Sequence, residues 1–324
     1  MGLVACGGSK KTTVTPAVTA APEPAAAEAA KAAVEPVKTA AEPVVKGPHV
    51  VTTVTEGLAA PESVLFDATN DRYLISNVNG SPLAVDNNGY IAVLKPDATT
   101  VEKWIVGGAN KVKLNAPKGM AIVEGVLYVS DINVVRKFDL ATGAAKGEIK
   151  LAGATFANDL SVGVDGMLYV SDSGMKMGKT DFEGTGTDAV WVINTKDKAP
   201  KAKKLLADKA LHRPNGLLAT TEGVWVVPFA ASDAYLLGGD GKVATTVAVG
   251  AAALDGICQL GGAMLVSSWE KNAVYRSGKG TEGLTFVPFI ENVASPADIE
   301  CDGGRNRVLI PRMMDNKVEV YQAP

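Results

Sequence analysis

The sequence has few of the residues on which several common kinds of protein depend. Only two histidines, His49 and His212, and three cysteines occur among 324 residues. So few histidines leave no persuasive Ser-His-Asp arrangement, and three cysteines cannot form the disulfide framework of a small secreted domain. Lys and Arg do not outnumber Asp and Glu, and the net charge of -3 argues against nucleic-acid binding. No segment after the N-terminal region has enough consecutive apolar residues to cross a bilayer.

The residues that are abundant point to short strands and tight turns. Hydrophobic residues make up 47% of the chain, which is enough for a sizeable core, and Ala and Val dominate them. The chain also has 34 glycines, which suit tight turns between strands. The composition therefore predicts an all-β globular protein.

The N-terminal part of the chain differs in composition from the rest. Cys6 closes "LVAC" and precedes "GGSKK", which resembles the lipobox of a bacterial lipoprotein. Residues 10–48 consist almost wholly of Ala, Pro, Val, Thr, Glu and Lys, a composition typical of a disordered tether. We expect a lipobox-like segment at 1–9, a disordered linker at 10–48 and lipid attachment through Cys6 to the bacterial cell envelope, at the outer membrane or on the periplasmic side in a Gram-negative cell.

The remaining chain, residues 49–324, repeats one pattern six times. Each repeat has a polar dipeptide, an apolar segment, a turn with Gly or Asp, and a short alternating strand such as "LYVSD". The fourth residue of that strand recurs roughly every 40 to 56 residues, a period that fits four short strands. These register positions are Ser76, Ser130, Ser171, Val227, Ser267 and Pro311. The pattern predicts a six-bladed β-propeller, in which the early strand "HVVTTVTEG" completes the last blade and closes the ring.

One position of the repeat gathers candidate metal ligands. The innermost strand of a propeller blade lies along the central channel, and its first residues face one mouth. In this register those residues are Glu62, Lys118, Asn158, Asn215, Asp255 and Asp298. A Glu, two Asn and an Asp among them carry hard oxygen donors, which suit Ca²⁺ or another divalent metal. The alternative interpretation is that Asn-Gly and Asp-Gly are only turn dipeptides.

Here the sequence resembles the family of senescence marker protein (regucalcin), gluconolactonases and related six-bladed lactonases. That family holds a divalent metal, usually Ca²⁺, with a Glu, an Asn of an Asn-Asp pair, an Asn in "NGL" and an Asp in "DG". Over about residues 50–323 this chain has the same order in "PESVLFD", "FANDL", "RPNGL" and "LDGIC". The resemblance implies a metal site made of Glu62, Asn158, Asn215 and Asp255.

The same resemblance implies that Asp255 is also the catalytic carboxylate. Phe156 stands where regucalcin-like members carry a substrate-binding Arg, which puts a sugar acid lactone in doubt as the substrate. We expect further residues at the rim of the same channel mouth, namely Lys118, Asp159 and Asp298. His212 is a rim candidate as well, but a surface imidazole is the favoured interpretation for it.

Two long connections and two cysteines complete the expectations. Residues 79–90 and 173–189 form two long connections on the same face as the proposed metal. One interpretation is that they act as lids or select ligands. The alternative is that they are tolerated surface variation. Cys258 and Cys301 lie inside apolar inner strands, and we expect both to be buried thiols.

Two functions from different classes follow from these features. One is a calcium-dependent hydrolase of a lactone or related ester, in which the metal polarises the carbonyl and Asp255 acts as base or nucleophile. The other is a non-catalytic propeller that binds a small ligand or an envelope protein and keeps calcium as a structural plug. The sequence leaves both open.

Overall fold

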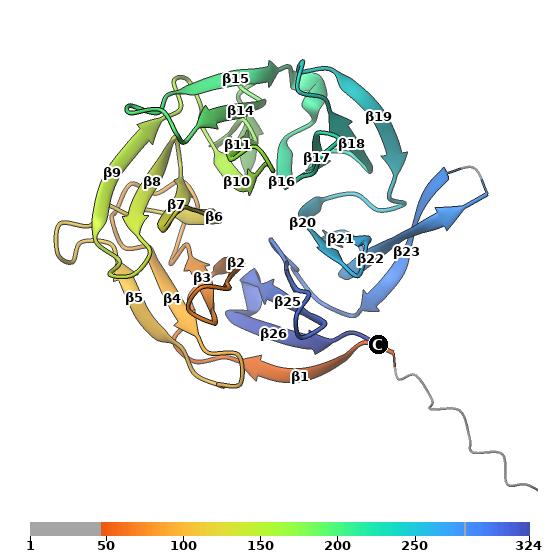
Figure 1. The fold of residues 1–324 in the computed structure, drawn as a ribbon, viewed down its shortest axis with the longest axis horizontal. Coiled ribbons are helices and arrows are strands. Elements are labelled where there is room, and N and C mark those ends of the chain that lie inside the picture. The colour runs from red at the N-terminus through yellow and green to blue at the C-terminus, as the bar shows by residue number, and fades with distance from the viewer. Residues whose placement is uncertain (1–46, 282) are drawn as a thin grey trace, which may run out of the picture. The chain divides into compact units, whose positions relative to one another are not determined.

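The computed structural model describes residues 47–281 and 283–324 of the chain, and within them the fold is a six-bladed β-propeller (Figure 1). Six four-stranded antiparallel sheets are arranged around a central axis. The inner-to-outer strands of the first three blades are β2 (Pro61–Asp67), β3 (Arg72–Asn77), β4 (Tyr90–Leu94) and β5 (Glu102–Val106); β6 (Pro117–Val123), β7 (Val126–Asp131), β8 (Val134–Asp139) and β9 (Ala145–Lys150); and β10 (Ala157–Val162), β11 (Met167–Asp172), β14 (Ala189–Asn194) and β15 (Ala202–Ala207).

The other three blades repeat this order. They consist of β16 (Pro214–Ala219), β17 (Val224–Pro228), β18 (Asp233–Leu237) and β19 (Val243–Ala248); β20 (Leu254–Leu260), β21 (Ala263–Ser268), β22 (Ala273–Gly280) and β23 (Gly283–Glu291); and β24 (Glu300–Asp302), β25 (Arg307–Arg312), β26 (Lys317–Gln322) and β1 (His49–Val54). A separate hairpin and two short 3-10 helices lie in the connections: β12 (Met175–Met177), β13 (Phe182–Gly184), η1 (Lys209–Leu211) and η2 (Met313–Asp315).

The ring closes with a strand from the start of the described chain. β1 pairs antiparallel with β26 as the outermost strand of the sixth blade, so the first and last strands share one sheet (Figure 1). The predicted closure is confirmed. Because every blade then packs between two neighbours, no blade leaves a whole face without a packing partner.

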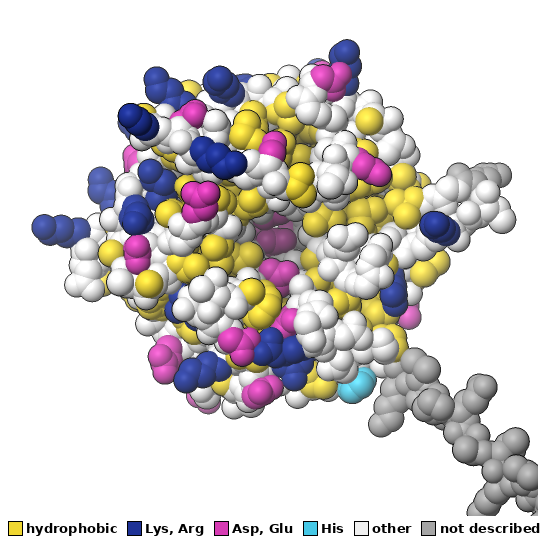
Figure 2. All heavy atoms as spheres, viewed as in Figure 1, with side chains coloured by type: hydrophobic (Ala, Val, Ile, Leu, Met, Phe, Trp, Pro, Cys, Tyr) yellow, Lys and Arg dark blue, Asp and Glu magenta, His cyan; other side chains and the backbone are white. Residues whose placement is uncertain are grey.

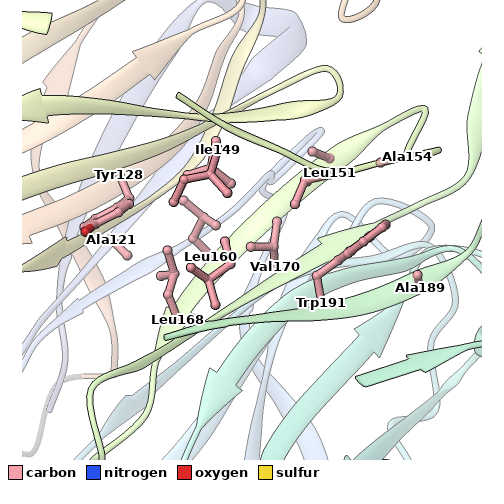
Figure 3. Close-up of a cluster of buried hydrophobic side chains, with 13 residues drawn as sticks. Ala121, Tyr128, Ile149, Leu151, Ala154, Leu160, Leu168, Val170, Ala189 and Trp191 are labelled. Atoms are coloured by element: carbon pink, nitrogen blue, oxygen red, sulfur yellow. The ribbon is translucent and has the colours of Figure 1, made fainter. Parts of the chain in front are cut away.

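The core is divided among the spaces between neighbouring blades. Between the second and third blades, Tyr128 and Ile149 pack with Leu160, Val170 and Trp191 in one buried cluster (Figure 3). Alternate residues of "LYVSD"-type strands supply such side chains, and each fully buried one contributes about 1.5 to 3 kcal/mol. Adjacent blades are therefore held together mainly by these apolar layers.

The expectation of two buried thiols is wrong. Cys258 of β20 and Cys301 of β24 form a disulfide with Cα atoms 5.6 Å apart. Each cysteine lies in an inner strand, and the inner strands of the fifth and sixth blades run side by side. The pair joins two blades, and inspection of either strand alone could not reveal it.

The N-terminal predictions lie outside the described residues. These are the lipidation of Cys6 and the tether, of which only residues 47 and 48 fall inside. In the described part of the chain, no helix has the length and apolar character needed to span a bilayer.

Candidate metal and substrate site

A cavity of about 770 Å³ opens at one end of the propeller axis. Its floor is made by the second residue of each of five inner strands: Glu62, Lys118, Asn158, Asn215 and Asp255. All five are buried, with at most 6% of each exposed. The face of the propeller drawn in Figure 2 also has acidic side chains in a hollow at the axis. The structure thus brings together the four residues predicted as metal ligands.

Serines of the register positions align these strands. Ser171 Oγ accepts from Asp159 N at 2.8 Å in its own blade and donates to Asn215 O of the next blade at 2.7 Å. Ser267 makes the equivalent pair, accepting from Gly256 N and donating to Ala297 O, both at 2.8 Å. The serine fixes both the pairing within its blade and the height of the next inner strand along the axis.

This pattern corrects the position predicted in the sixth blade. Ser267 donates to Ala297 as Ser171 donates to Asn215, so Ala297 occupies the level of the metal ligands. Asp298 lies one residue further along and accepts from Ser63 Oγ at 2.5 Å. It lines a separate cavity of about 410 Å³ formed by later residues of the inner strands.

Asp159 and His212 also lie away from the predicted mouth. Asp159 lines the second cavity with Asp298, and its Oδ2 accepts from Leu217 N at 2.6 Å. His212 is exposed, caps η1 in a left-handed conformation and does not line the ligand cavity. The neighbouring Arg213 does line it. Of the four rim candidates, only Lys118 belongs to the cavity, and His212 has the exposed position that was favoured for it.

The Asn-Gly and Asp-Gly dipeptides are not turns. Asn215 and Gly216 lie inside β16, and neither has a positive φ. A Cβ on Gly216 would lie 3.0 Å from Gly256 Cα and closer still to Asp255 O. A Cβ on Gly256 would lie 2.6 Å from Asp298 Cα. The glycines are needed because neighbouring inner strands approach each other closely around the narrow axis.

Three floor oxygens lack a hydrogen-bond partner among the described residues. They are Glu62 Oε2, Asn215 Oδ1 and Asp255 Oδ1. The other oxygen of Asp255 accepts from Trp269 Nε1 at 2.7 Å, and Asn158 Nδ2 donates to Ser173 Oγ at 3.1 Å. A buried unpaired polar atom costs about 1 to 3 kcal/mol, so three in one cavity indicate that a ligand belongs there.

The electrostatics of the floor point the same way. Burial and the negative charge of Asp159 raise the pKa of Asp255 to about 7, while the hydrogen bond from Trp269 lowers it. The pKa of Glu62 lies well above its usual range because of burial and the negative charge of Asp255. Two carboxyl groups that are hard to ionise together would be relieved by a bound cation.

Lys118 is the unusual member of the floor. Its Nζ donates to Ala116 O at 3.0 Å and lies 4.5 Å from the centre of the Phe156 ring. Only 1% of the residue is exposed, and burial lowers its pKa although Glu62 and Asp131 raise it. Among the described residues it forms no ion pair within 4.0 Å. The ammonium group therefore borders the cavity without neutralising either carboxylate directly.

The floor residues fit a hard divalent cation. Within residues 47–281 and 283–324, no three His, Cys, Asp or Glu side chains gather as a metal cluster. This set instead combines two carboxylates with two amides, a mixture of oxygen ligands that Ca²⁺ accepts and that leaves positions for water or substrate. The three unpaired oxygens belong to predicted ligands. Lys118 is the one group of the floor whose charge opposes a cation.

The two long connections both reach the cavity. Asn79, Gly80 and Pro82 come from the first, and Met175 and Phe182 come from the hairpin β12–β13 in the second. The structure therefore favours a role at the site over tolerated surface variation. Phe229, Trp269 and Met313 also line the cavity but could not be predicted from the sequence. They lie in other connections, where the only signal is an apolar residue directly after a strand.

Comparison of the chain with protein-family models finds no match, and comparison with curated proteins finds none either. The function must therefore be argued from the cavity and its residues.

Proposed function

We propose that the protein is a calcium-dependent hydrolase of a lactone or related ester. The observation that carries the proposal is the set of three unpaired, buried oxygens in the floor of a cavity large enough for a small molecule. The ordered set of Glu62, Asn158, Asn215 and Asp255 also resembles the regucalcin and gluconolactonase family, which supports the same reaction class.

The chain would perform the reaction with few groups. Glu62, Asn158, Asn215 and Asp255 would hold Ca²⁺, which when bound polarises the substrate carbonyl. Trp269 holds one oxygen of Asp255 and so fixes the orientation of the carboxylate. With one oxygen held by Trp269, the carboxylate of Asp255 is the floor group that can act as a general base.

In the proposed step Asp255 takes a proton from water as the water oxygen adds to the carbonyl carbon. The ester C–O bond then breaks, and the proton passes to the alcohol oxygen. The products are a carboxylic acid and an alcohol, joined in one molecule when the substrate is a lactone.

A second candidate is a non-catalytic propeller that binds a ligand or an envelope protein and keeps calcium as a plug. Deep burial of the four donors, each at most 6% exposed, favours it, because a cation enclosed among them can close the channel without contacting a substrate. The number of open positions on a bound metal separates the two candidates.

We further propose that the protein is a lipoprotein attached through Cys6 to a bacterial envelope. The lipobox-like "LVAC" motivates the anchor. The disulfide between Cys258 and Cys301 supports an oxidising compartment, because such bonds are rare in the reducing cytosol. Mass spectrometry of the native protein should find diacylglycerol on Cys6, and an unmodified thiol would refute the anchor.

Calorimetry on metal-free protein tests the site. We expect Ca²⁺ to bind and to raise the melting temperature by mass action, and Asp255→Asn to weaken binding at least about tenfold and to abolish hydrolysis. The matched control is Asp298→Asn, the same change in a channel carboxylate outside the cavity, which should affect binding less. No binding at millimolar Ca²⁺ would overturn both candidates; binding without turnover of any lactone or ester would leave the plug.

A further inference from the structure

We propose that the ligand of the cavity is an apolar compound with one carbonyl-bearing polar end, such as a lactone or ester with an alkyl or aryl body. This deepens the proposed function, on which it rests, because it names the substrate class of the same site. The walls of the cavity are mainly apolar, they carry few polar groups, and one buried ammonium group lies at the floor.

The walls of the cavity are built from large apolar side chains of four blades. They are Phe156, Met175, Phe182, Phe229, Trp269 and Met313. Two edge-to-face pairs shape them, with ring centres 6.1 Å apart for Phe156 and Phe182 and 6.2 Å apart for Phe229 and Trp269. Aromatic surfaces of this kind bind apolar bodies by burying their area.

The polar side chains of the walls are few, and three of them have one polar atom already engaged, while Arg213 adds a guanidinium group to the lining. Asn79 Nδ2 donates to Asn88 O at 2.9 Å, Asn316 Oδ1 accepts from Ala60 N at 2.7 Å, and Asp181 Oδ1 accepts from Phe182 N at 2.7 Å. A sugar acid lactone carries several hydroxyl groups, and each needs a partner when it leaves water. Arg213 can serve one or two such groups, but the six large apolar side chains offer none, whereas an alkyl or aryl body needs no partner.

The floor provides the polar end of the site. An ammonium group has three N–H donors, and Ala116 O accepts one from Lys118. The Phe156 ring covers the ammonium on one side, and both groups line the cavity. A ligand carbonyl or carboxylate oxygen at the floor can accept from Lys118 while the apolar body lies against Phe156 and Phe229. Lys118 thereby orients the ester group toward Asp255.

Binding of three lactones to the calcium-loaded protein tests this class. The probes are γ-butyrolactone, γ-decalactone and glucono-δ-lactone, followed by calorimetry. Each added methylene should tighten binding about two- to fourfold, so γ-decalactone should bind at least about 50-fold more tightly than γ-butyrolactone. Glucono-δ-lactone should show no binding at millimolar concentration.

Two variants separate the wall from the floor. Phe229→Ala should remove most of the gain from the alkyl chain, whereas Phe286→Ala, a change at a half-buried Phe of β23 outside the cavity, should not. Lys118→Met should weaken γ-butyrolactone and γ-decalactone by the same factor, because it removes the contact to their common polar end.

The outcomes distinguish this inference from the proposed function. Equal binding of γ-butyrolactone and γ-decalactone, or tighter binding of glucono-δ-lactone, would overturn the apolar substrate class. Hydrolysis of any of these lactones would still support the proposed hydrolase. Chain-length-dependent binding without hydrolysis would support the class and favour the non-catalytic candidate. Binding of none of the three would overturn the inference.

Discussion

Replacing Gly216 with Ala tests whether the Asn-Gly dipeptide serves a turn or the close approach of two inner strands. In the structure an added Cβ would lie 2.9 Å from Val227 Cγ2 and 3.0 Å from Gly256 Cα, and closer still to Asp255 O. The side chain of Val227 can yield, but the backbone of β20 cannot yield without moving. The strands β16 and β20 must therefore separate by several tenths of an ångström.

Overpacking of this kind costs about 1 to 3 kcal/mol. For a domain of this size, each kcal/mol corresponds to a fall in melting temperature of about 2 °C, so we expect a fall of about 2 to 6 °C. Calcium affinity should fall as well, because the displaced backbone carries Asn215 on one strand and Asp255 on the other.

Calorimetric melting with and without Ca²⁺ measures both effects. The matched control is Gly278→Ala, since Gly278 also lies in a strand but has no atom within 4 Å of an added Cβ. The control should leave the melting temperature unchanged or slightly raised, because Ala is favoured over Gly inside a strand. If Gly216→Ala also stabilises the protein, the strands are not closely packed at that point and the reasoning fails.

Two further predictions concern the far end of the channel. Reduction of the disulfide between Cys258 and Cys301, or Cys301→Ser, should destabilise the protein by up to about 4 kcal/mol, because the bond closes a loop with a sequence separation of 43 residues. Melting under oxidising and reducing conditions measures the effect, and no difference would mean that the bond is absent in solution. Burial raises the pKa of Glu300 to about 7. The folded state therefore binds more protons than the unfolded chain between about pH 4 and 7, and the free energy of unfolding falls as the pH rises through that window. Glu300→Gln should flatten the fall in melting temperature across it, and an unchanged slope would contradict the raised pKa.

The sequence by itself determined the architecture and the principal donors. A repeat whose period fits four short strands, with apolar and polar residues alternating, can bury its apolar faces only by stacking blades around an axis. Once that is known, residues at equivalent points of the repeats must converge on the channel. For this reason Glu62, Asn158, Asn215 and Asp255 could be predicted, and the structure places all four in one cavity floor.

Only the tertiary structure decided features that depend on contacts between blades. The sixth repeat has the least regular sequence. Ser267 of the preceding blade sets the position of its inner strand along the axis, and this places Ala297 and not Asp298 at the level of the ligands. The disulfide has the same origin, because Cys258 and Cys301 belong to different blades.

The apolar wall likewise formed only in three dimensions. Phe156, Phe229 and Trp269 come from connections far apart in the sequence, and no periodic pattern marks them. Hydrophobic periodicity reports which face of a strand is buried within its own blade. Packing between blades fixes the position of one inner strand along the axis relative to the next, and it also fixes which residues meet across the axis.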